Sequence, residues 1–117
     1  MADFEKVKAI ELDSGDKKYT LDFDRESCEW AENHGFSVDD LAAGKTEIRL
    51  FSDLFYYSFR KNHPNVTRQQ ANKILFEEMG GMPEGMLERL AELYVQPYNA
   101  LVQSEDAAKN SKWKVSL

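Results

Sequence analysis

The chain has 117 residues, of which 42% are hydrophobic and 31% charged, a composition typical of one globular domain rather than a disordered or fibrous chain. Its net charge of −6 argues against general binding to nucleic-acid phosphates, and no apolar run approaches the ~18 residues of a membrane helix. The first residues lack the basic-then-apolar order of a secretion signal, so we expect a cytoplasmic protein whose lone Cys28 forms no internal disulfide.

Residues 4–23 are expected to form a β-hairpin. Apolar and β-branched residues are mixed with charges up to Leu12, residues 13–16 (DSGD) favour a turn, and residues 19–23 (YTLDF) alternate apolar and polar side chains. An isolated hairpin is marginal in water, so this one must pack on helices or on another strand. Its free edge can accept a strand from a neighbour, which offers a route to self-association.

Local end signals place two helices after the hairpin. Asp24 is a favoured N-cap for a helix that runs to about His34, and Gly35 suits the left-handed position after its end. Residues 37–40 (SVDD) then open a helix of one to two turns, which Gly44 ends.

A stretch rich in aromatic residues, 50–67 (LFSDLFYYSFRKNHPNVT), contains most of the central helix. This helix should start near Thr46. It should end before Pro64, because the residue that precedes a proline is disfavoured in the helical conformation.

On a helical wheel, the apolar side chains of the central helix span roughly half of its circumference, which predicts burial against several neighbours. Arg49, Asp53 and Arg60 fall on the opposite side. Tyr56 lies on the border and is not explained by the core, and Tyr57 lies at the edge of the apolar arc. The apolar arc comprises Ile48, Leu50, Phe51, Leu54, Phe55, Tyr57 and Phe59.

Two further helices are expected. Thr67 and Gln70 form a capping box, and the helix that they start runs to Met79, where Gly80 and Gly81 stop it. Pro83 suits the first turn of the last helix.

The last helix shows one apolar stripe and contains Pro97, which removes a backbone hydrogen bond and predicts a kink. Its stripe comprises Leu87, Leu90, Tyr94, Pro97, Tyr98 and Leu101.

These patterns predict an α+β fold, a mainly helical small domain with an N-terminal hairpin. One globular domain is expected over residues 1–103, with the hairpin at about 4–23 and four to five helices at about 25–103. Residues 104–117 (SEDAAKNSKWKVSL) are polar and patternless, and a flexible tail is expected there.

No catalytic, cofactor-binding or metal-binding residues are predicted, and we do not expect an enzyme. No phosphate-binding loop is present, and His34 and His63 with one cysteine do not give a zinc spacing. Cys28 near a helix start is better explained as a small buried residue than as a nucleophile paired with a histidine. Asp39 and Asp40 are better explained as acids in the first turn of a helix than as a catalytic pair.

One alternative function is DNA binding. The central helix, the break at residues 63–66 (HPNV) and the helix that follows can pass for a helix-turn-helix with Arg68, Gln69 and Gln70 as base readers. Against this alternative, the turn lacks the usual glycine, the capping box occupies Gln70, and the chain is acidic. A small DNA-binding or regulatory protein of a mobile element therefore stays the second choice.

Two segments together resemble a known family: residues 19–41 (YTLDFDRESCEWAENHGFSVDDL) and residues 54–75 (LFYYSFRKNHPNVTRQQANKIL). They resemble the small tail assembly chaperones of long-tailed phages and prophages of Gram-positive bacteria. The resemblance covers about residues 17–103. It depends on the junction of hairpin and helix, the Trp-x-x-x-x-Gly-Phe ending, and the aromatic helix that runs into His-Pro-Asn-Val-Thr.

The resemblance implies a protein without catalytic activity in the host cytoplasm. Members of that family keep the tape measure protein soluble and recruit subunits of the tail tube, so the implied partners are the tape measure protein and the major tail protein. A long tape measure helix exposes apolar stripes, and aromatic or methionine-rich patches suit their reversible coverage. No cofactor is implied.

Five residues are predicted as protein-binding candidates: Tyr56, Tyr57, Met82, Met86 and Trp113. For the tyrosines the competing interpretation is an edge of the core, and for the methionines it is packing at helix ends. The indole of Trp113 lies in a polar segment with no core to join, which favours contact with a partner.

A further expectation concerns translation. Relatives often make a longer product by −1 ribosomal frameshifting, and residues 108–110 (Ala-Lys-Asn) can be encoded by GCA AAA AAC, which contains a slippery heptamer. Other codons for Lys109 or Asn110, without an overlapping downstream frame, would exclude this expectation.

Overall fold

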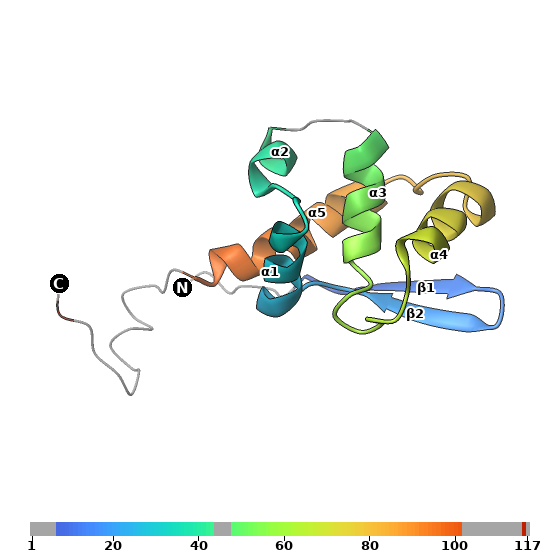
Figure 1. Ribbon diagram of the computed structural model, residues 1–117, viewed down its shortest axis with the longest axis horizontal. Helices are drawn as coiled ribbons and strands as arrows, with labels where there is room; N and C mark the ends of the chain where they lie inside the picture. Colours follow the sequence, from blue (N-terminus) through green and yellow to red (C-terminus); the bar gives the residue numbers. More distant parts are fainter. Residues whose placement is uncertain (1–6, 44–47, 102–115, 117) are drawn as a thin grey trace.

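A computed structural model describes residues 7–43, 48–101 and 116 of the chain. Within these residues the fold is α+β, with one antiparallel hairpin and five α-helices, so the predicted class is confirmed. Figure 1 shows the hairpin along one side of the helical layer. The predicted tail at residues 104–117 lies outside the described residues apart from Ser116, which is exposed.

The hairpin consists of β1 (Ile10–Ser14) and β2 (Lys17–Leu21), in a register that pairs Leu12 with Tyr19. Gly15 has a φ of 62°, as the first central residue of a two-residue type II′ turn requires. The strands are shorter than the predicted range of 4–23. The hairpin is followed at once by Asp22 and Phe23, which are buried.

Helix caps explain the next two elements, α1 (Arg25–Asn33) and α2 (Val38–Ala42). The Asp24 carboxylate accepts from the Ser27 amide at 2.7 Å, and the Ser27 hydroxyl accepts from the Asp24 amide at 2.8 Å, which forms a capping box. Ser37 caps α2 as predicted. The expected stop at Gly44 and the expected start of the next helix at Thr46 lie outside the described residues.

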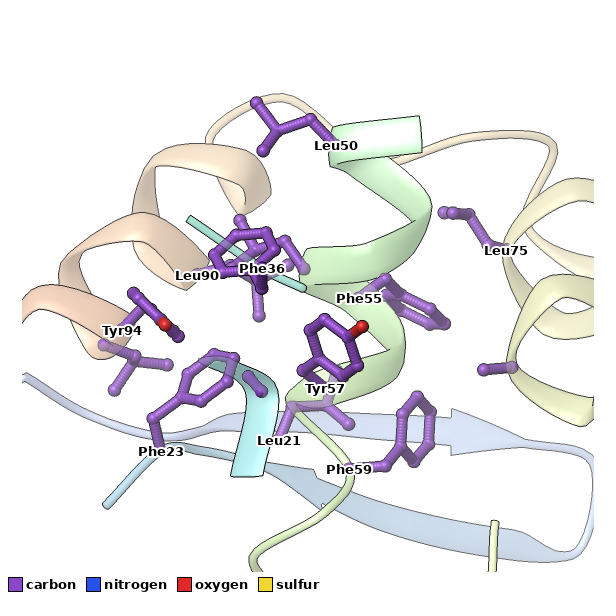
Figure 2. Packing of buried hydrophobic residues seen from close by; sticks show 14 of the residues in the cluster. Leu21, Phe23, Phe36, Leu50, Phe55, Tyr57, Phe59, Leu75, Leu90 and Tyr94 are labelled. Atoms are coloured by element: carbon purple, nitrogen blue, oxygen red, sulfur yellow. The ribbon is translucent and has the colours of Figure 1, made fainter. Parts of the chain in front are cut away.

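The core is centred on α3 (Ile48–Tyr57), against which α1, α4 (Arg68–Asn72) and α5 (Met86–Asn99) pack. Figure 2 shows aromatic side chains of α3, of the hairpin junction and of α5 pointing toward one another. Phe23 and Tyr94 meet edge to face at 5.0 Å, and Phe36 meets Tyr94 at 4.9 Å. Such edge-to-face arrangements are favoured by the quadrupole of the aromatic rings.

The helical wheel was wrong for two residues of α3, Ile48 and Asp53. Ile48 is 77% exposed at the first turn of the helix. Tyr57, which the wheel included at the edge of the apolar arc, is buried at 2% exposure. Asp53 is 9% exposed although it was placed opposite the core. Arg68 of α4 reaches across α3 and bonds to the Asp53 carboxylate at 2.7 Å, so the charge is buried with a partner.

The connection between α3 and α4 begins earlier than the sequence predicts. Helix α3 ends at Tyr57, earlier than predicted, and the chain turns over residues 58–62 before Pro64. Thr67 and Gln70 form the predicted capping box at the start of α4.

Helix α4 continues directly into a π-helical segment, η1 (Lys73–Glu78), which sequence reasoning did not predict. Gly80 and Gly81 end it with positive φ values, as expected. Helix α5 begins at Met86 after a left-handed Gly85, so Pro83 precedes the helix instead of lying in its first turn. Pro97 lies inside α5.

Candidate protein-binding surface

Two half-buried aromatic side chains meet at the surface between α1 and α3. The rings of Trp30 and Tyr56 are 5.9 Å apart at an interplanar angle of 65°. His34, one helical turn after Trp30, stacks on the indole at 4.1 Å, and its Nδ1–H donates to the Trp30 carbonyl at 2.7 Å. These contacts hold the indole in place while part of it faces solvent.

Two arginines cover these rings from the chain that follows α3. The Arg60 guanidinium lies 4.6 Å above the centre of the Trp30 ring, and the Arg68 guanidinium lies 4.7 Å above the Tyr56 ring. Cation–π contacts of this kind stabilise by about 0.5–1 kcal/mol where they are exposed. We call the set Trp30, His34, Tyr56, Arg60 and Arg68 the aromatic–arginine surface.

The two arginines differ in whether their charge is already paired within the protein. Arg68 is fixed by Asp53 at 2.7 Å and by the Tyr57 hydroxyl at 3.3 Å, and its side chain is 41% exposed. Arg60 forms no ion pair within the part of the chain that the structure describes, so its charge is available to an acidic group of a partner. Tryptophan, tyrosine and arginine are also the side chains most enriched among strongly contributing interface residues.

Of the predicted binding residues, Tyr56 belongs to this surface and Tyr57 lies beneath it. The Tyr57 hydroxyl donates to the His34 carbonyl at 3.3 Å. Burial, with the nearby Asp53 carboxylate, raises the pKa of this hydroxyl. Tyr57 therefore supports Tyr56 and Arg68 from inside and has almost no area to offer a partner.

The predicted methionines lie elsewhere. Met86 is 8% exposed at the start of α5, and Met82 is half-buried against the same core. These positions agree with the competing interpretation of the two methionines, which was packing at helix ends. Trp113 lies outside the described residues.

Sequence reasoning missed Trp30, His34, Arg60 and Arg68 as members of one surface. A partial signal was present, because Trp30 and His34 are four residues apart on one helix, and Arg60 follows Tyr56 by the same interval. The stacking across α1, α3 and α4 has no signal in a single sequence.

A groove of about 350 Å³ lies between α1 and α5 and contains the cysteine. Burial, with the carboxylates of Asp24 and Glu32, raises the pKa of the Cys28 thiol to about 12, and the thiol donates to the Tyr94 carbonyl at 3.4 Å. The Tyr98 hydroxyl donates to Glu32 at 2.6 Å. A thiol held neutral in this way is not an activated nucleophile.

Within residues 7–43, 48–101 and 116, no three histidine, cysteine or acidic side chains gather as a metal site. The described helices also include none that is long and apolar enough to cross a membrane.

Two of the three residues proposed for DNA reading, Arg68 and Gln70, already bond to other side chains or to the backbone of this protein. Arg68 bonds to Asp53, and the Gln70 side chain accepts from the Thr67 amide at 2.9 Å. Helix α4 is also only five residues long before it becomes η1. The arrangement offers little for major-groove contact.

Residues 1–117 match a protein family described as a domain of unknown function, DUF5055. The chain belongs to this family. No curated protein and no solved structure matches it. Because the family description assigns no activity, a function for this DUF5055 domain has to be argued from its geometry and from the resemblance of its sequence segments.

Proposed function

We propose that this protein is a phage or prophage tail assembly chaperone that acts by reversible protein binding in the host cytoplasm, without catalysis. The observation that carries the proposal is the aromatic–arginine surface, in which half-buried Trp30 and Tyr56 are held under Arg60 and Arg68. The resemblance of residues 19–41 and 54–75 to that chaperone family supports it. The proposed partners are the tape measure protein and the major tail protein.

The chemistry of the surface defines what it can bind. The two rings present apolar area with few rotatable bonds, which reduces the entropy lost on binding. The charge of Arg60 above the Trp30 ring favours a carboxylate beside an apolar stripe. An amphipathic helix of a tape measure protein, with acidic residues that flank its apolar positions, has this character.

Co-purification tests the proposed function directly. The full chain carries an affinity tag and is co-expressed with the products of the genes on either side of its own. We expect a long helical protein, or the tail tube subunit, to elute with it at a defined stoichiometry. Recovery of neither product from soluble extracts in which both are expressed would contradict the proposal.

Substitutions then test the surface. Tyr56→Ala and Arg60→Ala should each weaken binding to the captured protein by about tenfold or more, as is typical of strongly contributing interface residues. Phe76→Ala is the matched control, because Phe76 is a 48% exposed aromatic residue on η1 outside this surface. Equal losses from Phe76→Ala and Tyr56→Ala would remove the role assigned to the surface.

Folding must be monitored in parallel. Tyr56 contacts Arg68 and Trp30, so Tyr56→Ala should lower the free energy of unfolding by about 1 kcal/mol. Thermal unfolding of each variant separates this loss from the loss of binding.

A further inference from the structure

The two edges of the hairpin differ in their hydrogen bonding. Along the outer edge of β2, the Thr20 amide donates to His63 Nε2 at 2.9 Å, and the Asn62 side chain donates to the Thr20 carbonyl at 3.2 Å. Just beyond the strand, the Asp22 amide donates to the Ser58 carbonyl at 3.0 Å. The turn between α3 and α4 therefore covers the end of this edge next to α1, at Thr20 and Asp22.

The outer edge of β1 is open. The backbone N–H and C=O of Thr20 point away from β1. In an antiparallel pair the residue directly opposite, Glu11, then points its own N–H and C=O away from β2. Asp13, two residues further along β1, has the same orientation as Glu11. Neither residue has a backbone partner among the described residues. An unpaired edge of this kind is a template for an added strand.

The open strand is anchored at both ends. The Val7 amide donates to the Gln96 side chain at 3.0 Å, which holds the entry to β1 on α5. At the other end, the Ser14 hydroxyl donates to Glu78 of η1 at 2.9 Å. The edge is thus presented in a fixed conformation, which lowers the cost of adding a strand.

The side chains of β1 define the strand that would fit beside it. Glu11 and Asp13 are exposed on the outer face of the hairpin, whereas Ile10 and Leu12 are half-buried against the core on the inner face. A fitting strand therefore alternates basic and apolar residues, so that its cations face the two carboxylates and its apolar side chains extend the inner face.

This chain carries such a segment. In an extended conformation, residues 112–117 (KWKVSL) would have Lys112 and Lys114 on one face and Trp113 and Val115 on the other. We propose that residues 112–117 of one copy of the chain add as a third strand to the β1 edge of a second copy.

The charges favour pairing of β1 with residues 112–117 over pairing of two β1 strands with each other. If two β1 strands paired with each other, their acidic side chains would face like charges, which destabilises a sheet. Ser116, the residue of the segment that the structure describes, is exposed and outside both strands. Since each copy carries both the edge and the segment, two copies can satisfy each other reciprocally.

Amide hydrogen exchange with light scattering tests the proposal on the full chain and on a chain that ends at residue 110. The full chain should associate as concentration rises, and the amides of Glu11 and Asp13 should then exchange roughly tenfold or more slowly than in the shortened chain. The amide of Leu12, which pairs with Tyr19, should be protected in both.

Two results would overturn the assignment. Protection of Glu11 and Asp13 in a full chain that stays monomeric would show that residues 112–117 pair within their own chain. Association without protection of these amides would show that another surface joins the copies.

Charge reversal supplies the second test. The double variant Lys112→Glu/Lys114→Glu should dissociate at roughly tenfold higher concentration, because two favourable cross-strand pairs become repulsive. Adding Glu11→Lys and Asp13→Lys should restore association.

A composition control is available in the same segment. Trp113→Lys with Lys114→Trp keeps the amino-acid content but breaks the alternation of basic and apolar residues, so it should abolish association. Undiminished association of this control would contradict pairing through an alternating strand.

Discussion

Asp53 ties α3 to α4 through charge. Its carboxylate accepts from Arg68 at 2.7 Å and lies 3.6 Å from Arg49, and its side chain is 13% exposed. The same ion pair holds Arg68 over the Tyr56 ring, so one acidic residue supports both the core and the aromatic–arginine surface.

Asp53→Asn should lower the free energy of unfolding by about 1–2 kcal/mol, because the amide keeps the shape but loses the charge that the arginines compensate. Urea unfolding at pH 7 measures the loss. Glu92→Gln on the exposed side of α5 is the charge-matched control and should change stability by less than about 0.5 kcal/mol. Equal effects of the two substitutions would mean that net charge, and not the ion pair, matters.

Cys28 and Tyr94 predict how stability responds to alkaline pH. Burial, as the main cause, raises the pKa of the Cys28 thiol from 9.0 to about 12 and the pKa of the Tyr94 hydroxyl from 10.0 to about 12. Above pH 9 the unfolded chain loses these protons while the folded chain keeps them. The free energy of unfolding should therefore be unaffected by them below pH 9 and fall as pH rises from 9 toward 12.

Urea unfolding at intervals between pH 8 and pH 11 measures this dependence. Cys28→Ala should flatten the decline between pH 9 and pH 10, where the thiol of the unfolded chain ionises before its tyrosines. A decline of the same slope in Cys28→Ala would exclude the thiol as its source.

At the scale of elements, the sequence predicts best what is decided locally. The capping boxes at Asp24 and Thr67 and the stops at Gly35 and Gly80 depend on residues within a few positions, so the ends that they set are confirmed. Helix α3 shows the limit. Burial of Asp53 depends on Arg68 of another helix, which no wheel can include.

The candidate surface was less predictable than the fold. Tyr56 stands out in the sequence because the core does not explain it. Trp30 becomes its neighbour, and that of Arg60, only when α1 packs on α3. The π-helical form of η1 also lacked a signal, because residues 73–78 follow an ordinary helical start.

Thr67→Ala should destabilise α4 by about 1 kcal/mol, because it removes the side chain that satisfies the Gln70 amide at 3.1 Å. Amide exchange in α4 should accelerate more than exchange in α5, since α4 has five residues and little internal stability. Thr67→Ser, which keeps the hydroxyl, should restore most of the stability. Failure of serine to do so would assign the loss to the methyl group instead of the cap.

On the scale of the whole molecule, the connection between α3 and α4 joins β2 to the helices. Residues 58–63 lie along β2, and Lys61 bonds to the buried Asp22 carboxylate at 2.6 Å. His63 contributes an imidazole that accepts from the Thr20 amide and meets the Tyr19 ring edge to face at 5.1 Å. These groups cover the edge of β2 at Thr20 and the chain just beyond it at Asp22, whereas the edge of β1 is open at Glu11 and Asp13.

His63→Ala should therefore loosen the hairpin from the helices without unpairing its strands. The Thr20 amide loses its acceptor in a partly buried position, so its exchange should accelerate by roughly tenfold and the free energy of unfolding should fall by about 1–2 kcal/mol. The Leu12 amide, paired within the hairpin, should change much less.

Exchange measured by NMR resolves these amides, and Asn65→Ala, at an exposed site of the same connection, is the matched control. If exchange of the Thr20 amide and exchange of the Leu12 amide accelerate equally in His63→Ala, the hairpin unfolds as one unit with the helices, and His63 is a general core contact. If exchange of the Thr20 amide alone accelerates, the hairpin keeps its strand pairing without His63, and His63 only attaches it to the helices. The second result is the one expected, because the contacts of β1 with α5 and η1 do not pass through His63.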